Sequence, residues 1–153
     1  MIAVRRLGPG DEPLLELLAQ QDPAFDLEGR GSPRTPLGFA DARAYLSDAD
    51  VLHWVAEENH VAVGHLLSHV QRRRADGPFQ VMLYEIGVRD GCRRRGVGRA
   101  LITAMVTWMT EHRISTVWVL ADNPGAEDFY KALGFKRDAV QPVQLSLTTQ
   151  DRR

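Results

Sequence analysis

Apolar and polar residues alternate with a strand-like period in several runs of the chain. Residues 2–7 alternate weakly, and the runs 51–57 and 61–70 are rich in apolar and β-branched residues on either side of a short polar turn. These two runs predict an antiparallel hairpin. Residues 79–88, F-Q-V-M-L-Y-E-I-G-V, predict the next strand, and Gly87 inside it indicates a bulge or a close backbone approach.

Four other segments are predicted to be helices. They are residues 12–21, 39–47, 97–112 and 126–133. The first follows Asp11, a good N-cap residue, and four leucines form its expected buried stripe: Leu14, Leu15, Leu17 and Leu18. The last is ended by Gly134.

The remaining segments complete the predicted order of elements. Residues 22–39 are rich in proline, glycine, aspartate and arginine, which is typical of a long and often functional loop. The apolar runs 114–121 and 143–147 predict two further strands. The order is then strand, two helices, three strands, helix, strand, helix and strand. It predicts a mixed α/β fold in one domain over residues 1–153.

Composition and charge narrow the classes of protein to consider. Hydrophobic residues make up 44% and charged residues 25% of the 153 residues, as in an ordinary globular domain. The net charge of -1 provides no global field that would attract nucleic acid or an anionic membrane. No apolar run reaches the roughly 20 residues of a membrane span, and the single cysteine, Cys92, fits a reducing compartment. We therefore expect a soluble, cytoplasmic protein.

The segment 89–101, R-D-G-C-R-R-R-G-V-G-R-A-L, joins a predicted strand to the helix at 97–112. A helix N-terminus attracts anions because its N–H groups are unpaired and its dipole is positive there, and glycine lets the backbone approach closely. Arg93, Gly96 and Gly98 stand at this place. The segment predicts an anion site, with a solvated basic turn as the alternative.

Two familiar phosphate-binding loops do not fit these residues. Gly91 and Gly96 have P-loop spacing, but Val97 and Gly98 stand where a lysine and a hydroxyl residue would hold phosphate and magnesium. Gly96 and Gly98 also begin a dinucleotide fingerprint, yet Leu101 takes the place of its third glycine. The loop thus fits neither a nucleoside triphosphatase nor a Rossmann fold well.

Two motifs resemble those of a known family. Arg93-x-x-Gly96-x-Gly98 resembles the acetyl-CoA pyrophosphate loop of the GNAT superfamily of N-acetyltransferases. Further along, Asn123-x-x-Ala126-x-x-Phe129-Tyr130-x-x-x-Gly134-Phe135 is similar to the second signature of that family, in the same order and spacing. The resemblance covers residues 51–147. It implies a mostly antiparallel sheet that splays apart at a bulge in the strand Y-E-I-G-V, flanked by about four helices.

The resemblance also implies acetyl-CoA as the acyl donor and assigns residues to it by position. Ile86, Gly87 and Val88 would offer main-chain groups to the pantetheine arm and the thioester. The residues expected to bind the pyrophosphate are Arg93, Arg94, Arg95, Gly96, Val97, Gly98 and Arg99, and those of the second motif are Asn123, Ala126 and Tyr130. Asn123 is also placed to cap the helix that follows it.

Acetyl transfer to an amine needs a base for the ammonium and an acid for the leaving thiolate. Glu85, beside the expected thioester, is the candidate base; it would otherwise bind the acceptor ammonium or simply face solvent. Tyr130 matches the general acid of the family, with a core aromatic as the alternative. Cys92 has no adjacent histidine, so we expect direct transfer in a ternary complex rather than an acyl-cysteine.

Acidic residues on the expected acceptor side favour a small cationic amine as the acceptor. They are Asp22, Asp26, Glu28, Glu85 and Asp122. Within the superfamily, Tyr84-Glu85 and Ala121-Asp122 most resemble the Tyr-Asp and Ala-Asp pairs of aminoglycoside 3-N-acetyltransferases. The resemblance therefore implies Glu85 and Asp122 as acceptor contacts.

Several alternatives stay open at this point. One alternative is that the acceptor is a peptide or protein amine. Another is that the domain binds acyl-CoA without catalysing a reaction. The arginine triplet at 72–74 raises nucleic-acid binding, although we expect a solvated turn and no nucleic-acid partner. His53, His65 and His69 have ligand-like spacing but no acidic third ligand, so no metal site is expected. A homodimer is implied by the resemblance, because family members are often dimers.

Overall fold

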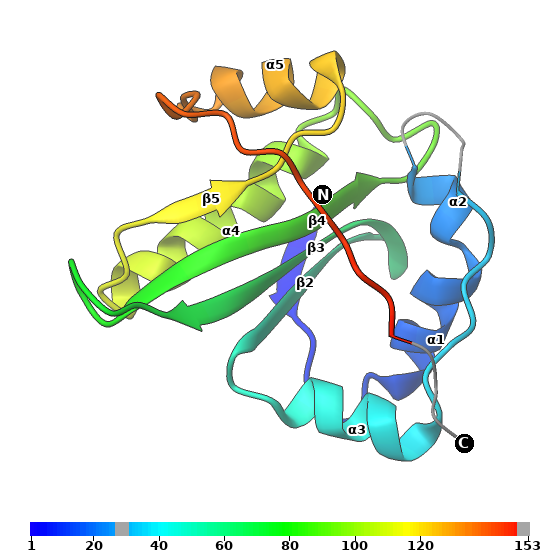
Figure 1. Cartoon of the computed structure of the whole chain (residues 1–153). Coiled ribbons are helices and arrows are strands. Elements are labelled where there is room, and N and C mark those ends of the chain that lie inside the picture. The colour runs from blue at the N-terminus through cyan, green and yellow to red at the C-terminus, as the bar shows by residue number, and fades with distance from the viewer. Residues whose placement is uncertain (27–30, 150–153) are drawn as a thin grey trace. The chain divides into compact units, whose positions relative to one another are not determined.

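The computed structural model describes residues 1–26 and 31–149. The chain divides into two compact units, one from Met1 to Leu120 and the other beginning at Ala121. Among the described residues, the first unit contains every strand and four helices, and the second contains the helix α5 (Figure 1). No helix among the described residues combines the length and the apolar character needed to cross a membrane.

A five-stranded sheet in the order β1-β2-β3-β4-β5 is the frame of the first unit. The strands are β1 (Ala3–Arg6), β2 (Val51–Glu58), β3 (Val61–Arg72), β4 (Phe79–Val88) and β5 (Val117–Val119). Neighbouring strands are antiparallel except β4 and β5, which are parallel. The hairpin and the strand at 79–88 that the alternation predicts are therefore confirmed, and the mostly antiparallel sheet is as expected.

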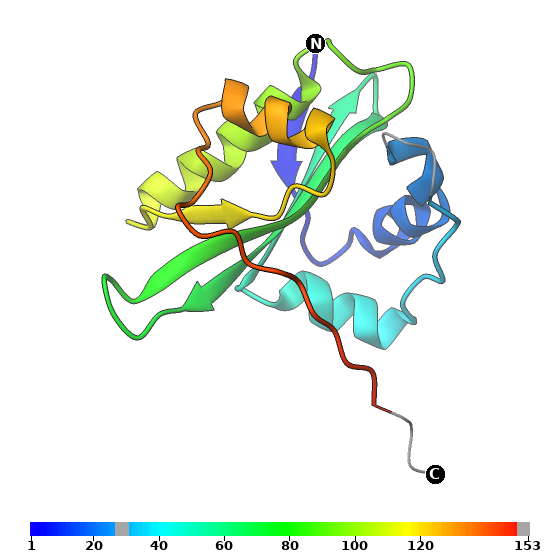
Figure 2. The same cartoon turned by 45° about the horizontal axis from the view of Figure 1, so that its top comes forward.

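The helices of the first unit lie on both faces of this sheet. They are α1 (Glu12–Gln20), α2 (Asp22–Phe25), α3 (Phe39–Ser47) and α4 (Val97–Glu111). Figures 1 and 2 show α1, α2 and α3 on one face and α4 on the other. The sequence predicts α1, α3 and α4 closely. It misses α2 because a helix of 4 residues is too short to show a period.

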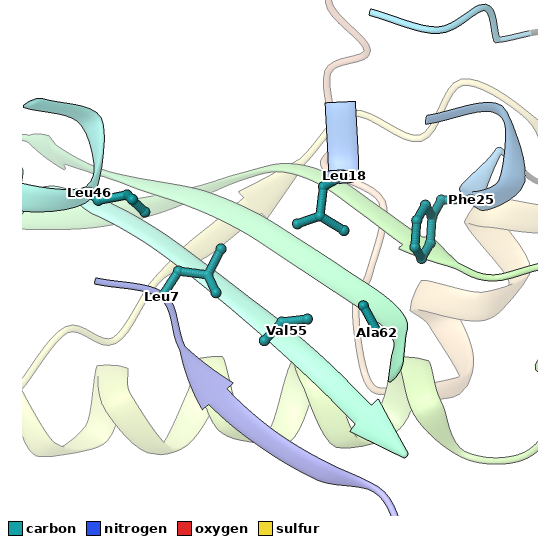
Figure 3. Packing of buried hydrophobic residues seen from close by; sticks show 6 residues of the cluster. All are labelled: Leu7, Leu18, Phe25, Leu46, Val55 and Ala62. Atoms are coloured by element: carbon teal, nitrogen blue, oxygen red, sulfur yellow. The ribbon is translucent and has the colours of Figure 1, made fainter. Parts of the chain in front are cut away.

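An apolar cluster fills the space between the sheet and α1, α2 and α3 (Figure 3). Its buried members are Leu7, Leu18, Phe25, Leu46, Val55 and Ala62. Burying a large aliphatic or aromatic side chain contributes about 1.5–3 kcal/mol. Of the leucine stripe predicted for α1, Leu18 is buried in this cluster and Leu14 and Leu15 pack against it, whereas Leu17 is exposed.

Two local predictions are wrong. The carboxylate of Asp11 does not cap α1; it accepts a hydrogen bond from the Gly8 N–H (2.9 Å) and pairs with Arg5 (3.0 Å). Arg5 is a stronger partner than a backbone amide because the hydrogen bond is charge-assisted. Residues 143–147 form no strand. Their alternation suits a sheet, but an extended segment without a partner strand gains no ladder hydrogen bonds to offset its ordering.

Candidate functional site

The strand β4 is paired along both edges in its first half and along one edge in its second half. β5 pairs with Val81–Leu83, whereas β3 follows β4 as far as Val88. From Tyr84 to Val88, the second edge of β4 has no strand beside it in the described chain. Main-chain N–H and C=O groups on such an edge are available to a ligand. The splayed sheet expected at this strand is confirmed (Figure 1).

The bulge in β4 lies at Tyr84 and not at Gly87. Leu67 is opposite Glu85 and Ser68 is opposite Leu83, so Tyr84 is the extra residue on the bulged strand. Gly87 is needed for a different reason. A Cβ there would stand 2.8 Å from Cβ of Phe25 and 3.0 Å from its carbonyl oxygen, so only glycine lets α2 lie this close to β4.

The loop after β4 ends at an uncapped helix N-terminus. Gly96 has a φ of 85°, a left-handed conformation that favours glycine, and it begins α4 without a side-chain cap. The first helical hydrogen bond runs from the Ala100 N–H to the Gly96 carbonyl (3.0 Å). The N–H groups of Val97, Gly98 and Arg99 thus have no partner within the helix. No acidic side chain occupies the first turn, so this end of α4 suits an anion.

The arginines of the loop differ in their contacts. The guanidinium of Arg93 donates to the carboxylate of Asp90 (3.2 Å) and to the carbonyl of Asp26 (3.0 Å), which ties the loop to the end of α2. Arg95 forms a bidentate pair with Glu58 (2.7 and 2.8 Å). Arg94 and Arg99 are exposed and have no ion pair with any described residue. These two are the cations most available to a bound phosphate.

Close backbone packing holds α4 and α2 near the end of β4. A Cβ on Gly64 would stand 2.6 Å from Cγ1 of Val97, so the first turn of α4 rests directly on β3. On the other face, Arg89 donates to the side-chain oxygen of Gln21 (2.7 Å) and its guanidinium lies 4.7 Å from the ring centroid of Phe25. Nothing in the sequence pattern identifies Arg89, because its partners come from residues far away in the chain.

Glu85 lies half-buried at the bulge, on the side of the sheet that faces α1, α2 and α3. Burial raises the pKa of its carboxyl group; the nearby cation of Arg34 opposes this effect and the carboxylate of Asp22 adds to it. Arg34 itself pairs with Asp22 (3.2 Å). The side chain of Glu85 has no hydrogen bond or ion pair with the rest of the described chain, so its carboxylate is available to a ligand. A carboxylate whose pKa is raised is a better proton acceptor near neutral pH.

Three polar side chains are linked by hydrogen bonds on the side of the sheet that α1, α2 and α3 cover. The Tyr45 hydroxyl lies 2.8 Å from Nδ1 of His53, and Nε2 of His53 lies 3.0 Å from Nδ1 of His65. Both histidines are buried, and burial lowers the pKa of His53 to about 3 and that of His65 to about 4. The sequence shows their spacing in the hairpin but not the tyrosine that completes the chain.

The second motif lies in the second unit, at α5 (Pro124–Ala132). The side-chain oxygen of Asn123 accepts a hydrogen bond from the Ala126 N–H (2.8 Å), which confirms the predicted cap, and its amide donates to Asp122 (3.0 Å). The ring of Tyr130 contacts Phe129 and Phe135, with centroids 5.3 and 5.2 Å apart.

Tyr130 keeps its proton well above neutral pH. Burial, with the Asp122 carboxylate adding to it, raises the pKa of Tyr130 to about 12.

Of the acidic residues predicted on the acceptor side, Glu28 lies outside the described residues. No group of three or more histidine, cysteine, aspartate or glutamate side chains suited to a metal ion occurs in the part of the chain that the structure describes.

Comparison with protein families matches these motifs and this fold. The acetyltransferase (GNAT) family matches residues 13–135. The chain belongs to the GNAT family of acetyltransferases. The region matched includes β4, the loop before α4 and the whole of α5, so both motifs of this GNAT acetyltransferase fall within it.

Relatives of this GNAT protein agree with that assignment. An uncharacterized N-acetyltransferase of Methanocaldococcus jannaschii is 34% identical over 76 residues, or 48% of this chain. The match covers 31% of that relative, so the chain spans about a third of the length of the curated protein that it matches.

Solved structures share the fold. An aminoglycoside acetyltransferase from an uncultured soil metagenomic sample, in complex with trehalose, is 22% identical with a TM-score of 0.84, and 97% of each chain is covered. Its complex with sisomicin is 24% identical with a TM-score of 0.81 and the same coverage. The ribosomal-protein-alanine N-acetyltransferase of Brucella melitensis biovar Abortus 2308 is 17% identical with a TM-score of 0.71, covering 95% of this chain and 99% of that one. At these identities the likenesses show the fold alone.

Proposed function

We propose that this protein is an acetyl-CoA-dependent N-acetyltransferase that moves an acetyl group to a primary amine of a small cationic acceptor. The observation that carries the proposal is the uncapped N-terminus of α4 directly beyond the open edge of β4. A ligand whose anionic group binds at the helix end would be able to extend an attached arm along that edge. The acyl carrier CoA has this form, with a diphosphate at one place and an amide-containing arm leading to its sulfur.

The loop and the strand would divide the cofactor between them. The N–H groups of Val97, Gly98 and Arg99 would bind the diphosphate, with the side chains of Arg94 and Arg99 supplying charge. Arg95 would reach the phosphates only by leaving Glu58, whereas Arg93 would keep the loop in place through its contact with α2. The main chain of Ile86 and Val88 would bind the pantetheine arm, and Asn123 and Ala126 would contact the cofactor from the second motif.

The transfer would form one C–N bond and break one C–S bond. Glu85 would take a proton from the acceptor ammonium, and its raised pKa suits that task. The amine would then attack the thioester carbonyl directly, and Tyr130 would donate a proton to the CoA sulfur as it leaves. A tyrosine with a raised pKa is fully protonated at neutral pH and so holds the proton that this step needs. Asp122 would contact the acceptor.

The acidic surroundings of Glu85 support a cationic acceptor. Asp22 acts electrostatically on Glu85, and its ion-pair partner Arg34 has a side chain that is largely exposed. An aminoglycoside is the proposed example, in line with the names of the structural neighbours. Activity confined to peptides would instead identify a peptide or protein N-acetyltransferase. A homodimer in the cytoplasm stays a prediction, and light scattering of the purified protein tests the dimer.

Calorimetric titration with acetyl-CoA and a thiol-release assay with aminoglycosides, polyamines and peptides test the proposal. Saturable binding and turnover with a cationic small amine are expected. Glu85→Gln and Tyr130→Phe should each lower kcat by about 100-fold or more, while the exposed Glu111→Gln control should not. Failure to bind acetyl-CoA at millimolar concentration would contradict the proposed function, and binding without turnover of any amine would indicate a non-catalytic acyl-CoA-binding module.

A further inference from the structure

The chain Tyr45–His53–His65 is a polar network placed under an otherwise apolar face. Its members come from α3, β2 and β3, and the two hydrogen bonds measure 2.8 and 3.0 Å. The free energy lost when polar groups leave water is offset only in part by their hydrogen bonds. A buried chain of this kind therefore stabilises the fold less than apolar side chains of the same size would. The apolar cluster beside it shows that apolar packing is available here.

The two bonds couple the protonation of the three side chains. Both histidines are neutral near pH 7, because burial strongly disfavours their charged forms. A neutral imidazole carries a proton on one nitrogen and a lone pair on the other. Only two patterns then satisfy both bonds. In one, Tyr45 donates to His53 and His53 donates to His65; in the other, every donor and acceptor is reversed.

The surroundings of His65 favour the first pattern. Its Nε2 end lies beside Gly87, 3.4 Å from where a Cβ would stand, and the ring of Phe25 contacts it edge-on at a centroid distance of 5.2 Å. Phe25 belongs to α2, which also carries Asp22, and the carboxylate of Asp22 acts electrostatically on His65. The Nε2 end of His65 therefore faces α2, and a negative charge on that side favours a proton on Nε2.

A proton on Nε2 of His65 sets the direction of the whole chain. Nδ1 of His65 must then accept from Nε2–H of His53, and Nδ1 of His53 must accept from the hydroxyl of Tyr45. The Tyr45 hydroxyl donates its only proton in this hydrogen bond. Its oxygen keeps lone pairs for another donor. Glu85 lies in the same cross-strand row as His53, with Leu67 between them, and its carboxylate acts electrostatically on Tyr45.

We propose that the Tyr45 hydroxyl oxygen binds the acceptor amine as a hydrogen-bond acceptor beside Glu85, and that His53 and His65 are positioning residues that hold it in this orientation. The inference rests on the proposed function and names the group that binds its substrate. A primary ammonium has three N–H donors, so it can serve Glu85 and Tyr45 together. The charged groups around the chain are Asp22 and Glu85, and His69 is the other titratable neighbour of His53.

The direction of the chain can be read without any assay of activity. In protein labelled with ¹⁵N-histidine, long-range ¹H–¹⁵N correlations at pH 7 report which nitrogen of each ring carries the proton. We expect Nε2–H on both His53 and His65, and we expect Asp22→Asn to raise the share of Nδ1–H in both rings together. Nδ1–H on both rings in the wild type would overturn the inference, because Tyr45 would then donate outward.

Steady-state kinetics test the role of the hydroxyl. Tyr45→Phe keeps the ring that packs on the apolar cluster and should raise KM for the amine by about tenfold or more, because it removes a hydrogen bond to a charged group. KM for acetyl-CoA should not change. Ser47→Ala is the matched control, since it removes a hydroxyl from the same helix that bonds only the carbonyl of Arg43. An unchanged KM for the amine, or equal changes in both KM values, would overturn the inference.

The histidines are tested by a pair of substitutions. His53→Leu removes the acceptor for the Tyr45 proton and should raise KM for the amine, whereas His53→Gln, which can still accept and donate, should restore part of the loss. Equal KM values in the two variants would contradict the positioning role. If the wild type binds acetyl-CoA but turns over no amine, the proposed function fails together with this inference. If only the Tyr45 and His53 effects are missing, the inference fails alone.

Discussion

Protonation of the buried histidine pair should make the stability of this protein fall steeply in mild acid. Burial depresses the pKa of His53 and His65 in the folded protein from the ordinary value of 6.5. The unfolded chain therefore binds more protons than the folded one as the pH falls below that value. The contribution of each neutral histidine is fully present above its unfolded pKa and declines until the pH reaches the folded pKa.

The size of the effect depends mainly on the unfolded chain. A histidine that stays neutral in the fold at pH 5, where its unfolded form is almost fully protonated, destabilises the protein by about 2 kcal/mol relative to pH 8. The two together give about 4 kcal/mol. This is a large part of the usual 5–15 kcal/mol of stability of a domain. The double variant His53→Gln, His65→Gln should lack this dependence.

Urea unfolding followed by circular dichroism at pH 8, 6.5 and 5 measures it. Lowering the pH from 8 to 5 should reduce the free energy of unfolding of the wild type by about 4 kcal/mol more than that of the double variant. His60→Asn is the control, because His60 is exposed and its φ of 63° suits asparagine. Parallel curves for wild type and double variant would refute the reasoning, since they would mean that the pair is protonated as easily in the fold as in the unfolded chain.

Three further substitutions test the remaining elements of the site. Glu85→Gln should stabilise the protein at pH 7 but not at pH 4 in urea unfolding, because a carboxyl with a raised pKa is unfavourable only where it is charged; an equal effect at both pH values would contradict this. Gly87→Ala should reduce the free energy of unfolding by about 1–3 kcal/mol, because the new Cβ would overlap Phe25, and an unchanged urea midpoint would show that α2 moves away easily. Gly96→Ala should reduce stability by about 1–2 kcal/mol through its left-handed φ and weaken acetyl-CoA binding in calorimetry; intact affinity would argue against a diphosphate at this turn.

Local patterns in the sequence identify most of the secondary structure and the glycine- and arginine-rich loop before α4. The alternation at 51–57, 61–70 and 79–88 and the leucine-rich helix near the N-terminus reflect which face of each element is buried, and this information is carried by neighbouring residues. The loop before α4 is identifiable for the same reason, because its glycines and arginines are adjacent in the chain. Gly87 is recognised as unusual from its position inside a strand, but its reason is not.

Contacts between distant segments decide the rest. The edge of β4 is open because β5 is only 3 residues long, the bulge is at Tyr84, and Gly87 accommodates Phe25 from α2. The Tyr45–His53–His65 chain brings together α3, β2 and β3, so no local period can signal it. Strand ends, bulges and buried polar chains depend on which partner reaches a given backbone or side-chain group, and partners of this kind are chosen by packing in three dimensions rather than by neighbours along the chain.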